Sequence, residues 1–596
     1  MKLHPADLRL YYLQRASPKI AGYPEIQSYF PSLELLFPSL VDQASGSPTL
    51  AAAELVCDTA EDASGNVVAN VEHLVTRARR STSVWLRKMH LLEPLNVLSG
   101  EYVAPRDGSL PAPRGPWQRA LRKLNDPHNE AYTDAVFACM ASRLTETGRS
   151  PHFCRFFGTF NGRTETYKYD ITDDMPDLEE DDWFHAGLKN KAFDIEVTDL
   201  WSGISTLWSE MGEKPFSRAL ALNHMLELAD ALTVSSGGSS VSGAESIGSE
   251  TEEDSCNDEI EEVELEVSGT AIVNRQNRVQ LNRLSASGSA TGSATASTGT
   301  SDAEDDIVYK LVVKDFPTQI TVLERCDGTM DDLMEDEISE EATDDMHDTK
   351  EERWTAWMFQ VIAALSTAQQ AYDFVHNDLH TNNVMWVGTG ITHVYYHIQG
   401  APGGDRVYKV PTYGRLFKII DFGRATFRPP AAATGGNHMW FPDAYAPDGD
   451  AYAQYNCGPY FDQTQPKVQP NKSFDLCRLA VAVLDTLWTE TPASAPANRV
   501  MTCEPGRAQN ETVSPLWNLM WLWLTDKAGK NMLRTPADEE RYPKFDLYCA
   551  IARDAQNAVP AQQLTLPLFN NAFRCKRRDI PAESPVWKLY ASPKQV

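Results

Sequence analysis

The sequence predicts an α+β protein with two lobes, a small strand-rich lobe followed by a larger helical one. Strand-like runs cover 151–160, 307–313 and 319–323. Apolar residues recur at helical spacing over 129–144 and again over about 352–372. The order is therefore strands and a helix, more strands, and then mostly helices. This order indicates a small α+β lobe that precedes a helical lobe.

A long low-complexity insertion interrupts the strand-rich lobe. Residues 235–249 are rich in Ser and Gly, residues 285–301 are rich in Ser, Ala, Thr and Gly, and an acidic run at 250–266 lies between them. Such stretches bury too little apolar surface to offset the entropy that a chain loses when it orders. We therefore expect a disordered acidic and Ser-rich insertion over about 164–306, with its low-complexity core at 233–306.

These features set the expected domain boundaries in the chain of 596 residues. We expect an N-terminal extension at 1–50, the strand-rich lobe at 51–326 with the insertion inside it, and the helical lobe at 327–596. The extension is either a packing element or a partner-binding arm, and the sequence favours neither. The oligomeric state is equally open.

Composition and charge exclude several classes of partner and site. The net charge of −29 argues against general binding of nucleic acid or anionic membranes. The apolar runs are too short to span a bilayer, and the first residues lead into no apolar signal core. The 10 cysteines contain no C-x-x-C pair, so neither a disulfide framework nor a structural zinc site is expected. We therefore expect an intracellular protein in a reducing compartment, without a nucleic-acid or membrane partner.

The most informative residues form two motifs in the second half of the chain. Residues 376–383 read HNDLHTNN, which matches H-x-D-x-x-x-x-N, and residues 418–423 read KIIDFG, which contains D-F-G. Each motif lies beside an apolar, strand-like run. In this order the two motifs resemble the catalytic loop and the metal-binding turn of the protein-kinase superfamily.

The residues around the motifs make the resemblance more specific. FVHNDLHTNNVM at 374–385 and VPTYGRLFKIIDFGRA at 410–425 resemble the divergent kinase-like proteins of giant DNA viruses. The resemblance covers about 54–163 and 307–590 and leaves the insertion outside. It implies a two-lobed protein-kinase-like fold, ATP and Mg²⁺ as cofactors, and transfer of phosphate to a protein substrate, to Ser or Thr more readily than to Tyr. It also implies a viral protein in the cytoplasm of an infected host cell or in the virion.

The resemblance implies roles for the residues of both motifs. Phosphoryl transfer needs positioning and charge neutralisation more than covalent chemistry from the protein. Asp378 would orient the acceptor hydroxyl or take its proton, and Asn383 and Asp421 would supply oxygen ligands to Mg²⁺. The ring of His376 is expected to bond to the backbone near the D-F-G turn. Asp475, on a predicted buried helix, is expected to anchor the catalytic loop.

Two residues of the loop depart from the usual pattern. Asn377 replaces an Arg that normally pairs with a phosphorylated activation loop, which argues against this form of control. His380 replaces a Lys that often contacts the transferred phosphate. His380 either contacts phosphate when protonated or only fills space, and the sequence does not distinguish these alternatives.

The strand-rich lobe supplies the expected contacts to the nucleotide phosphates. SVWLRKMH at 83–90 reads as a strand, so Lys88 is the candidate cation for the α- and β-phosphates, with Glu130 at the start of the next helix as its partner. Gly65 lies on a plausible hairpin and is the single glycine of a degenerate glycine-rich loop. The alternative interpretations of these three residues are a surface lysine, an ordinary N-terminal helix glutamate and a plain turn.

The expected adenine site follows the strand at 319–323. Leu323 would be the gatekeeper of the pocket, and Glu324 and Cys326 would offer backbone C=O and N–H groups to adenine. The alternative is a strand-to-helix turn that binds no ligand.

Three functions are compatible with these residues. Asp378, Asn383 and Asp421 favour an active protein kinase, because a scaffold needs none of the three. His380 favours a small-molecule phosphotransferase, and so does the segment after the D-F-G turn, 424–472, which lacks the A-P-E sequence that ends this segment in protein kinases. The poor glycine loop and the uncertain assignment of Lys88 favour a pseudokinase or scaffold.

Overall fold

The computed structural model describes most of the chain as two compact units. The described residues are 9–13, 18–37, 47–101, 110–111, 119–199, 203–211, 216–225, 228, 307–339, 347–400, 404–429, 438–487, 515–535 and 539–590. One unit comprises the described parts of Met1–Thr166 and Lys314–Val596, and the other comprises the described parts of Tyr167–Arg275 and Ser293–Val313. The low-complexity core predicted at 233–306 lies outside the described residues.

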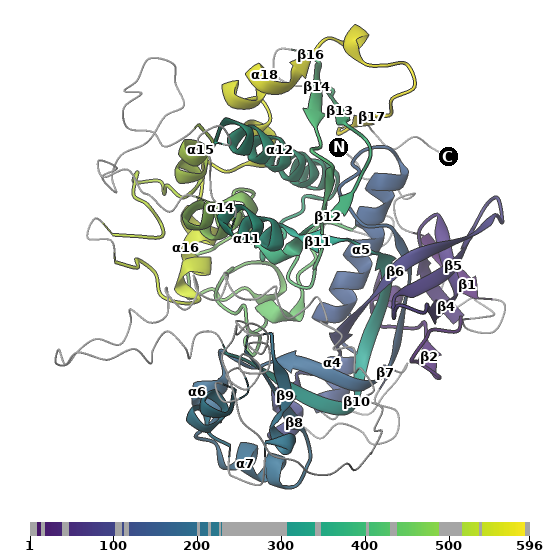
Figure 1. Ribbon diagram of the computed structural model, residues 1–596, viewed down its shortest axis with the longest axis vertical. Coiled ribbons are helices and arrows are strands. Elements are labelled where there is room, and N and C mark those ends of the chain that lie inside the picture. The colour runs from purple at the N-terminus through teal and green to yellow at the C-terminus, as the bar shows by residue number, and fades with distance from the viewer. Residues whose placement is uncertain are drawn as a thin grey trace, which may run out of the picture. The chain divides into compact units, whose positions relative to one another are not determined.

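An antiparallel sheet forms the strand-rich part of the first unit (Figure 1). Its strands, in spatial order, are β2 (Ile26–Gln27), β7 (Phe156–Asp170), β10 (Ile307–Glu324), β6 (Arg79–His90), β5 (Val67–His73) and β4 (Glu54–Glu61). The two strands predicted at 307–313 and 319–323 are one continuous strand, β10. Apolar side chains of β4, β5, β6, β7 and β10 form one buried cluster, which explains why Val and Ile alternate along these strands.

The N-terminal residues are a packing element rather than a free arm in their described part. Strand β1 (Arg9–Leu13) pairs with β3 (Ser47–Ala51), and helix α1 (Ser32–Leu36) follows β2. Ile20 and Tyr23 are buried in the cluster under the sheet, and the Tyr23 hydroxyl lies 2.9 Å from the Thr164 hydroxyl on β7. The structure therefore favours the packing alternative for the predicted extension.

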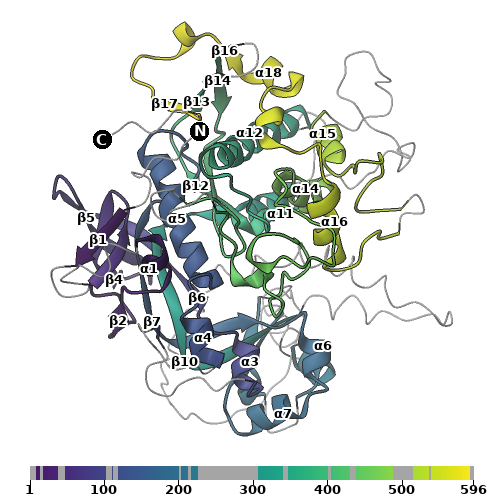
Figure 2. The ribbon, with the colours of Figure 1, turned by 180° about the vertical axis from the view of Figure 1, so that it is seen from behind.

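Helix α5 (Glu130–Glu146) lies between the sheet and the helices of the first unit (Figures 1 and 2). The Asn129 side chain caps its first turn by accepting a hydrogen bond from the Ala131 N–H. Residues 131–144 are all buried, so the helix is a core element rather than an amphipathic surface helix. Phe137 packs against Phe374 and Phe422, with ring centroids 4.3 and 4.8 Å away, and so joins α5 to both sequence motifs. Two short helices, α3 (Pro94–Leu98) and α4 (Arg119–Leu124), precede it.

Helices dominate the C-terminal half of the first unit. They are α11 (Met330–Ser339), α12 (His347–Tyr372), α14 (Phe474–Leu487), α15 (Pro515–Trp523), α16 (Asp546–Asp554), α17 (Pro560–Gln563) and α18 (Pro567–Phe573). Single 3₁₀ turns lie at Thr381–Asn383, Asp443–Tyr445, Gly458–Tyr460 and Arg577–Asp579. Helix α12 is the predicted long helix, and it delivers the chain directly to the loop at 376–383.

Two small sheets accompany these helices. The first has the order β11 (Gly328–Thr329), β12 (Val384–Gly388) and β15 (Arg415–Ile419). The loop at 376–383 leads into β12, and the D-F-G sequence follows β15. The second has the order β16 (Arg574–Cys575), β14 (Arg406–Pro411), β13 (His393–Ile398) and β17 (Val586–Lys588). Strand β17 pairs in parallel with β13, so residues near the C-terminus return to the middle of the chain.

The second unit is a folded part of the predicted insertion. Strand β8 (Asp194–Asp199) pairs with Ile307–Val312 of β10 and with β9 (Ser205–Leu207), and the helices are α6 (Met175–Leu178) and α7 (Asp182–Lys189), followed by a 3₁₀ turn at Trp208–Glu210. Its core contains the aromatic residues Phe184, Phe193, Trp208, Phe216 and Tyr309. The prediction of disorder is therefore wrong for the described residues between 164 and 225, because their aromatic side chains build a core of their own.

The predicted α+β class is confirmed. The described residues combine a strand-rich N-terminal part with a helix-rich C-terminal part. None of the described helices is long and apolar enough to cross a membrane.

Candidate active site

A buried carboxylate holds the loop at 376–383. Asp475, on α14, accepts hydrogen bonds at Oδ1 from the backbone N–H groups of His376 and Asn377, both at 3.0 Å. Burial raises the pKa of Asp475 to about 6, because desolvation disfavours its charged form. The Nε2 atom of His376 lies 2.8 Å from the backbone oxygen of Ile420. The predicted anchoring role of Asp475 and the predicted contact of the His376 ring are both confirmed.

Asn377 joins the loop to the segment after the D-F-G turn. Its backbone is in the left-handed region, with φ of 68°, which Asn tolerates better than most residues. Its amide donates a hydrogen bond to the Arg424 backbone oxygen at 2.9 Å and accepts one from the Tyr455 hydroxyl at 2.5 Å. The Asn377 side chain therefore connects the loop to Arg424 and Tyr455.

Asp378 is an ionised carboxylate whose position is fixed by a tyrosine. Its Oδ1 atom accepts a hydrogen bond from the Tyr548 hydroxyl at 3.1 Å, and Arg478 Nε donates to the same hydroxyl at 3.0 Å. Burial opposes ionisation, but the positive charge of Arg424 and further charges nearby outweigh it and lower the pKa of Asp378 to about 2. Asp378 therefore carries a negative charge across the physiological range of pH.

Asn383 and His380 contact each other within the loop. The Asn383 amide nitrogen donates to the Asp378 backbone oxygen at 2.9 Å and lies 3.0 Å from Nε2 of His380. Burial lowers the pKa of His380 to about 4, so its imidazole is neutral at pH 7. This neutrality favours the alternative in which His380 supports the loop, here by orienting Asn383, over the alternative of a phosphate-binding cation.

Asp421 belongs to a partly buried ion-pair cluster that connects strand β6 with α5 and the D-F-G turn. Arg87 Nη2 lies 2.5 Å from Asp421 Oδ1, and Arg87 Nε lies 3.1 Å from Asp134 Oδ2. Asp134 Oδ1 accepts a further hydrogen bond from the Phe422 backbone N–H at 2.7 Å. Asp421 has a φ of 66°, and a strained backbone of this kind is typical of functional sites. We call Arg87, Asp134 and Asp421 the Arg87 cluster.

The structure does not bring Lys88 and Glu130 together, so the predicted pair is wrong. Lys88 is exposed and pairs across the sheet with Ile320, on the face opposite to Arg87, because successive residues of a strand point to opposite faces. Glu130 lies next to Gly423, but its backbone N–H bonds to Asp443, and burial raises the pKa of its carboxyl to about 7. No ion pair among the described residues joins Lys88 to Glu130.

The turn that carries Gly65 satisfies its own backbone N–H groups. Asp62 Oδ1 accepts hydrogen bonds from the N–H groups of Ser64 and Asn66, both at 2.9 Å, and the Gly65 N–H bonds to the Asp62 backbone oxygen at 3.1 Å. Gly65 has a φ of 74°, which explains the glycine. These three N–H groups are therefore not available to phosphate in this conformation, and Gly65 serves the turn.

Leu323 is the residue predicted to be the gatekeeper of a nucleotide pocket. It is buried at the end of β10 and lines a small cavity together with Asp134, Asp421 and Phe422. The cavity has a volume of about 10 Å³, which is room for one water molecule at most. This cavity beside Leu323 is therefore too small to hold a ligand.

The segment after Leu323 presents free backbone groups at Cys326, whereas the N–H of Glu324 is already bonded. The Glu324 N–H bonds to the Arg155 backbone oxygen at 2.9 Å, and the Glu324 carboxylate accepts from Lys418 at 3.1 Å. The backbone N–H and C=O of Cys326 have no hydrogen-bond partner within the described part of the chain. Cys326 is therefore better suited than Glu324 to donate to a nucleobase.

Three residues near the predicted site were missed from the sequence. Arg87 pairs with Asp134, whereas Lys88 and Glu130 were predicted to pair. Arg87 is one residue before Lys88, and Asp134 is one helical turn after Glu130. Trp85 lies on the same face of β6 as Arg87 and opposite Leu323, and 52% of its surface is exposed. An exposed tryptophan that pairs across the sheet with Leu323 offers a flat surface for a planar ligand. The signal in the sequence is the strand alternation, which groups Trp85 with Arg87.

The residues predicted to hold Mg²⁺ lie on neighbouring strand ends. Val384 pairs with Ile419 across β12 and β15, and the Ile420 N–H bonds to the Asn383 backbone oxygen at 3.1 Å, so Asn383 and Asp421 adjoin. The described residues contain no cluster of three or more His, Cys, Asp or Glu suited to a metal. One carboxylate and one amide oxygen fit Mg²⁺, which usually keeps several waters and shares substrate phosphates as ligands.

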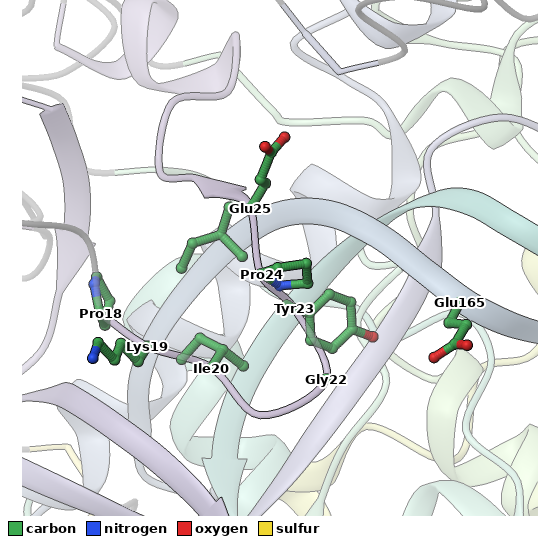
Figure 3. Close-up of a pocket in the computed structure, with 9 residues that line it drawn as sticks. Pro18, Lys19, Ile20, Gly22, Tyr23, Pro24, Glu25 and Glu165 are labelled. Carbon is green, nitrogen blue, oxygen red and sulfur yellow. The ribbon is translucent and has the colours of Figure 1, made fainter.

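A separate cavity of about 810 Å³ lies at the N-terminal turn (Figure 3). Lys19, Tyr23, Glu25 and Glu165 are among the residues that line it. None of the motif residues lines it.

Comparison with known proteins gives no relative from which a role could be transferred. No protein-family model matches this chain, and no curated protein is significantly similar to it.

Proposed function

We propose that this protein is an ATP-dependent phosphotransferase of the protein-kinase type, with a protein hydroxyl as the acceptor. The observation that carries the proposal is the Arg87 cluster, which adjoins the loop that holds Asp378 and Asn383. A cation, a potential metal ligand and an ionised carboxylate for the nucleophile are the groups that phosphoryl transfer requires.

The arrangement of elements supports this proposal. Strands β4, β5, β6, β10 and β7 are consecutive across the sheet, and α5, which connects β6 to β7 along the chain, carries Asp134. The segment at 324–328 then links β10 to β11 and the helices. We infer a protein-kinase-like arrangement, in which a strand-rich lobe and a helical lobe contribute to one site.

Asp378 acts on the acceptor hydroxyl in this proposal. Tyr548 occupies its Oδ1 atom, while its Oδ2 atom accepts no hydrogen bond from the described residues. Oδ2 is therefore the atom that would orient the hydroxyl of a Ser or Thr side chain and accept its proton. The low pKa of Asp378 favours orientation of the hydroxyl over early proton removal.

The nucleotide is held by the cation and by the segment after β10. Arg87 takes the role first assigned to Lys88, because it faces Asp134 and Asp421. Cys326 offers backbone groups to adenine, and Trp85 offers a stacking surface. Asn383 and Asp421 would hold Mg²⁺, which neutralises charge on the phosphates when it is bound.

A nucleotide-binding pseudokinase is the second candidate. Two observations favour it: the N–H groups of Ser64, Gly65 and Asn66 are already bonded within their turn, and Arg87 occupies one oxygen of the Asp421 carboxylate. A small-molecule phosphotransferase loses one of its two supports, because His380 is neutral at pH 7.

Phosphate transfer from labelled ATP separates these candidates. The full-length protein is incubated with ATP, Mg²⁺ and a generic protein acceptor, beside Asp378→Asn and the matched control Asp177→Asn, which alters an exposed aspartate on α6. We expect transfer by the wild type and the control and a loss of at least about 100-fold in Asp378→Asn. Nucleotide binding with no transfer in any of the three proteins would support the pseudokinase instead, and no binding would overturn both.

A further inference from the structure

Two thiols face each other where β7 begins and β10 ends. Cys154 lies two residues before β7, and Cys326 lies two residues after β10. Their Sγ atoms are 3.6 Å apart. Cys154 is buried, while Cys326 is partly exposed, so Cys326 is the more accessible of the two residues.

The surrounding contacts hold these thiols together. The Glu324 N–H bonds to the Arg155 backbone oxygen at 2.9 Å, and the Arg155 N–H bonds to the Glu324 carboxylate at 3.1 Å. Lys418, itself buried, donates to that carboxylate and to the Phe153 backbone oxygen at 3.1 and 3.3 Å. Each cysteine is thus flanked by residues that are bonded across the gap, and the two sulfur atoms are kept within reach of each other.

We propose that Cys154 and Cys326 form a modification site, at which a hydroperoxide closes a disulfide bond between them. Transient disulfides in reducing compartments are usually regulatory or catalytic, whereas permanent ones are rare there. The shape of the site suits a transient bond, because the thiols are in contact and one of them is accessible.

The reaction proceeds in two steps. The Cys326 thiolate attacks a peroxide oxygen, the O–O bond breaks, and a sulfenic acid and one water (or alcohol) form. Cys154 then loses its proton and attacks the Cys326 sulfur, an S–S bond forms, the S–O bond breaks, and a second water leaves. The two thiols lose two electrons in total, and the peroxide gains them.

The order of the two steps follows from accessibility and acidity. Cys326 is expected to meet the peroxide first because it is partly exposed, whereas Cys154 is buried. The hydrogen bond with Cys326, together with burial, raises the pKa of Cys154 well above its ordinary value, so Cys154 is the slower thiol and acts second. Bond closure is therefore expected to be faster at alkaline pH.

Closure of the bond would act on the nucleotide site, and this consequence rests on the proposed function. The sulfur atoms must approach from 3.6 Å to about 2.05 Å, which draws Cys326 toward the start of β7. The backbone groups of Cys326 are those proposed to bind adenine, and Cys154 lines the cavity that also contains Asp421 and Leu323. A displacement of about 1 Å in a binding segment is enough to weaken a ligand strongly.

Peptide mapping tests the site without any assumption about ATP. The full-length protein is treated with hydrogen peroxide, free thiols are blocked by alkylation, and the digest is analysed by mass spectrometry without reduction. We expect one dominant cross-linked pair that contains Cys154 and Cys326, two hydrogen masses below the sum of its peptides and reversed by dithiothreitol. It should persist in Cys57→Ser, a control on β4, and vanish in Cys154→Ser and Cys326→Ser. The proposal would be overturned if both cysteines are recovered as alkylated thiols, or if the Cys154–Cys326 pair is only a minor fraction among many random pairs.

ATP binding supplies the second readout. The oxidised wild-type protein should bind ATP at least about 10-fold more weakly than the reduced protein, dithiothreitol should restore the affinity, and Cys326→Ser should be insensitive to peroxide. If the mapped disulfide forms and the affinity is unchanged, the regulatory consequence is wrong. If the reduced protein itself binds no ATP, the proposed function fails, whereas the mapping result still decides whether the modification site exists.

Discussion

Removal of the Asp134 carboxylate should destabilise the first unit. Asp134 is almost completely buried and accepts hydrogen bonds from Arg87 Nε at 3.1 Å and from the Phe422 N–H at 2.7 Å. Asp134→Ala leaves Arg87 with Asp421 as its remaining ion-pair partner and leaves a buried backbone N–H without an acceptor. We therefore expect a lower free energy of unfolding for this variant.

The size of the effect follows from these two losses. Loss of one partner from a buried ion pair costs about 3–5 kcal/mol, and an unsatisfied buried N–H costs about 1–3 kcal/mol. The two losses belong to one network and do not add fully. Arg87 keeps Asp421 at 2.5 Å and its side chain is 19% exposed, which reduces the first loss. We expect a total of about 3 kcal/mol for Asp134→Ala.

Urea unfolding measures this loss. With a slope of about 3 kcal/mol per molar urea, the midpoint of the transition of the first unit should fall by about 1 M. Asp134→Asn should lose less, because its amide oxygen still accepts from the Phe422 N–H. The control Asp448→Ala alters an exposed aspartate of the same unit and should leave the midpoint unchanged. An Asp134→Ala midpoint equal to that of the control would refute the reasoning.

Three further predictions concern the site itself. Trp85→Ala should weaken ATP binding by about 5- to 100-fold in calorimetric titration, because stacking of a base on an aromatic ring contributes about 1–3 kcal/mol, while Trp85→Phe should lose less; equal affinities would remove Trp85 from the nucleotide site. Tyr548→Phe removes the hydroxyl that bonds to Asp378 Oδ1 and should lower kcat by about 10-fold with little change in KM; a raised KM at constant kcat would contradict a positioning role. The pH profile of transfer should lack an acid limb above about pH 5. The pKa of Asp378 is depressed to about 2 and that of His380 to about 4, so both side chains keep their pH 7 protonation state down to about pH 5. The stability that each group contributes is present above its ordinary pKa and is lost progressively as the pH falls to the depressed value. A limb near pH 6.5 that disappears in His380→Gln would mean that His380 titrates as an active cation.

The helical half of the site could be predicted because its residues belong to short, contiguous stretches of sequence. The loop at 376–383 and the D-F-G turn are contiguous motifs, so the sequence alone locates Asp378, Asn383 and Asp421. Asp475 was predicted from the resemblance of residues 473–480 to the buried central helix of the kinase large lobe, and its hydrogen bonds to the loop N–H groups confirm the anchoring contact.

The strand-rich half could not be predicted to the residue. Arg87 and Lys88 are adjacent cations, and only the tertiary structure decides which face of β6 points toward α5. The alternation of Val84 and Leu86 was the available signal, because it puts Lys88 on their face and Arg87 on the other. Asp134 lies one helical turn after Glu130, so a shift of one turn in the docking of α5 exchanges their roles.

The folded part of the insertion was missed for a different reason. Its aromatic residues are spread over 184–216 and meet a partner strand at 307–312 that follows the whole low-complexity core. Such a long-range pairing leaves no local pattern in the sequence. The same is true of β17, which pairs with β13 from near the C-terminus.

The most direct test of the central claim compares two adjacent residues. The claim is that Arg87, rather than Lys88, is the cation of a phosphotransferase site that includes Asp378. ATP affinity and phosphate transfer are measured in Arg87→Met and Lys88→Met, which remove one charge each from opposite faces of the same strand. We expect Arg87→Met to lose at least about 10-fold in affinity and most of the transfer, and Lys88→Met to retain both within about two-fold. Loss of binding and transfer in Lys88→Met with an active Arg87→Met would contradict the claim.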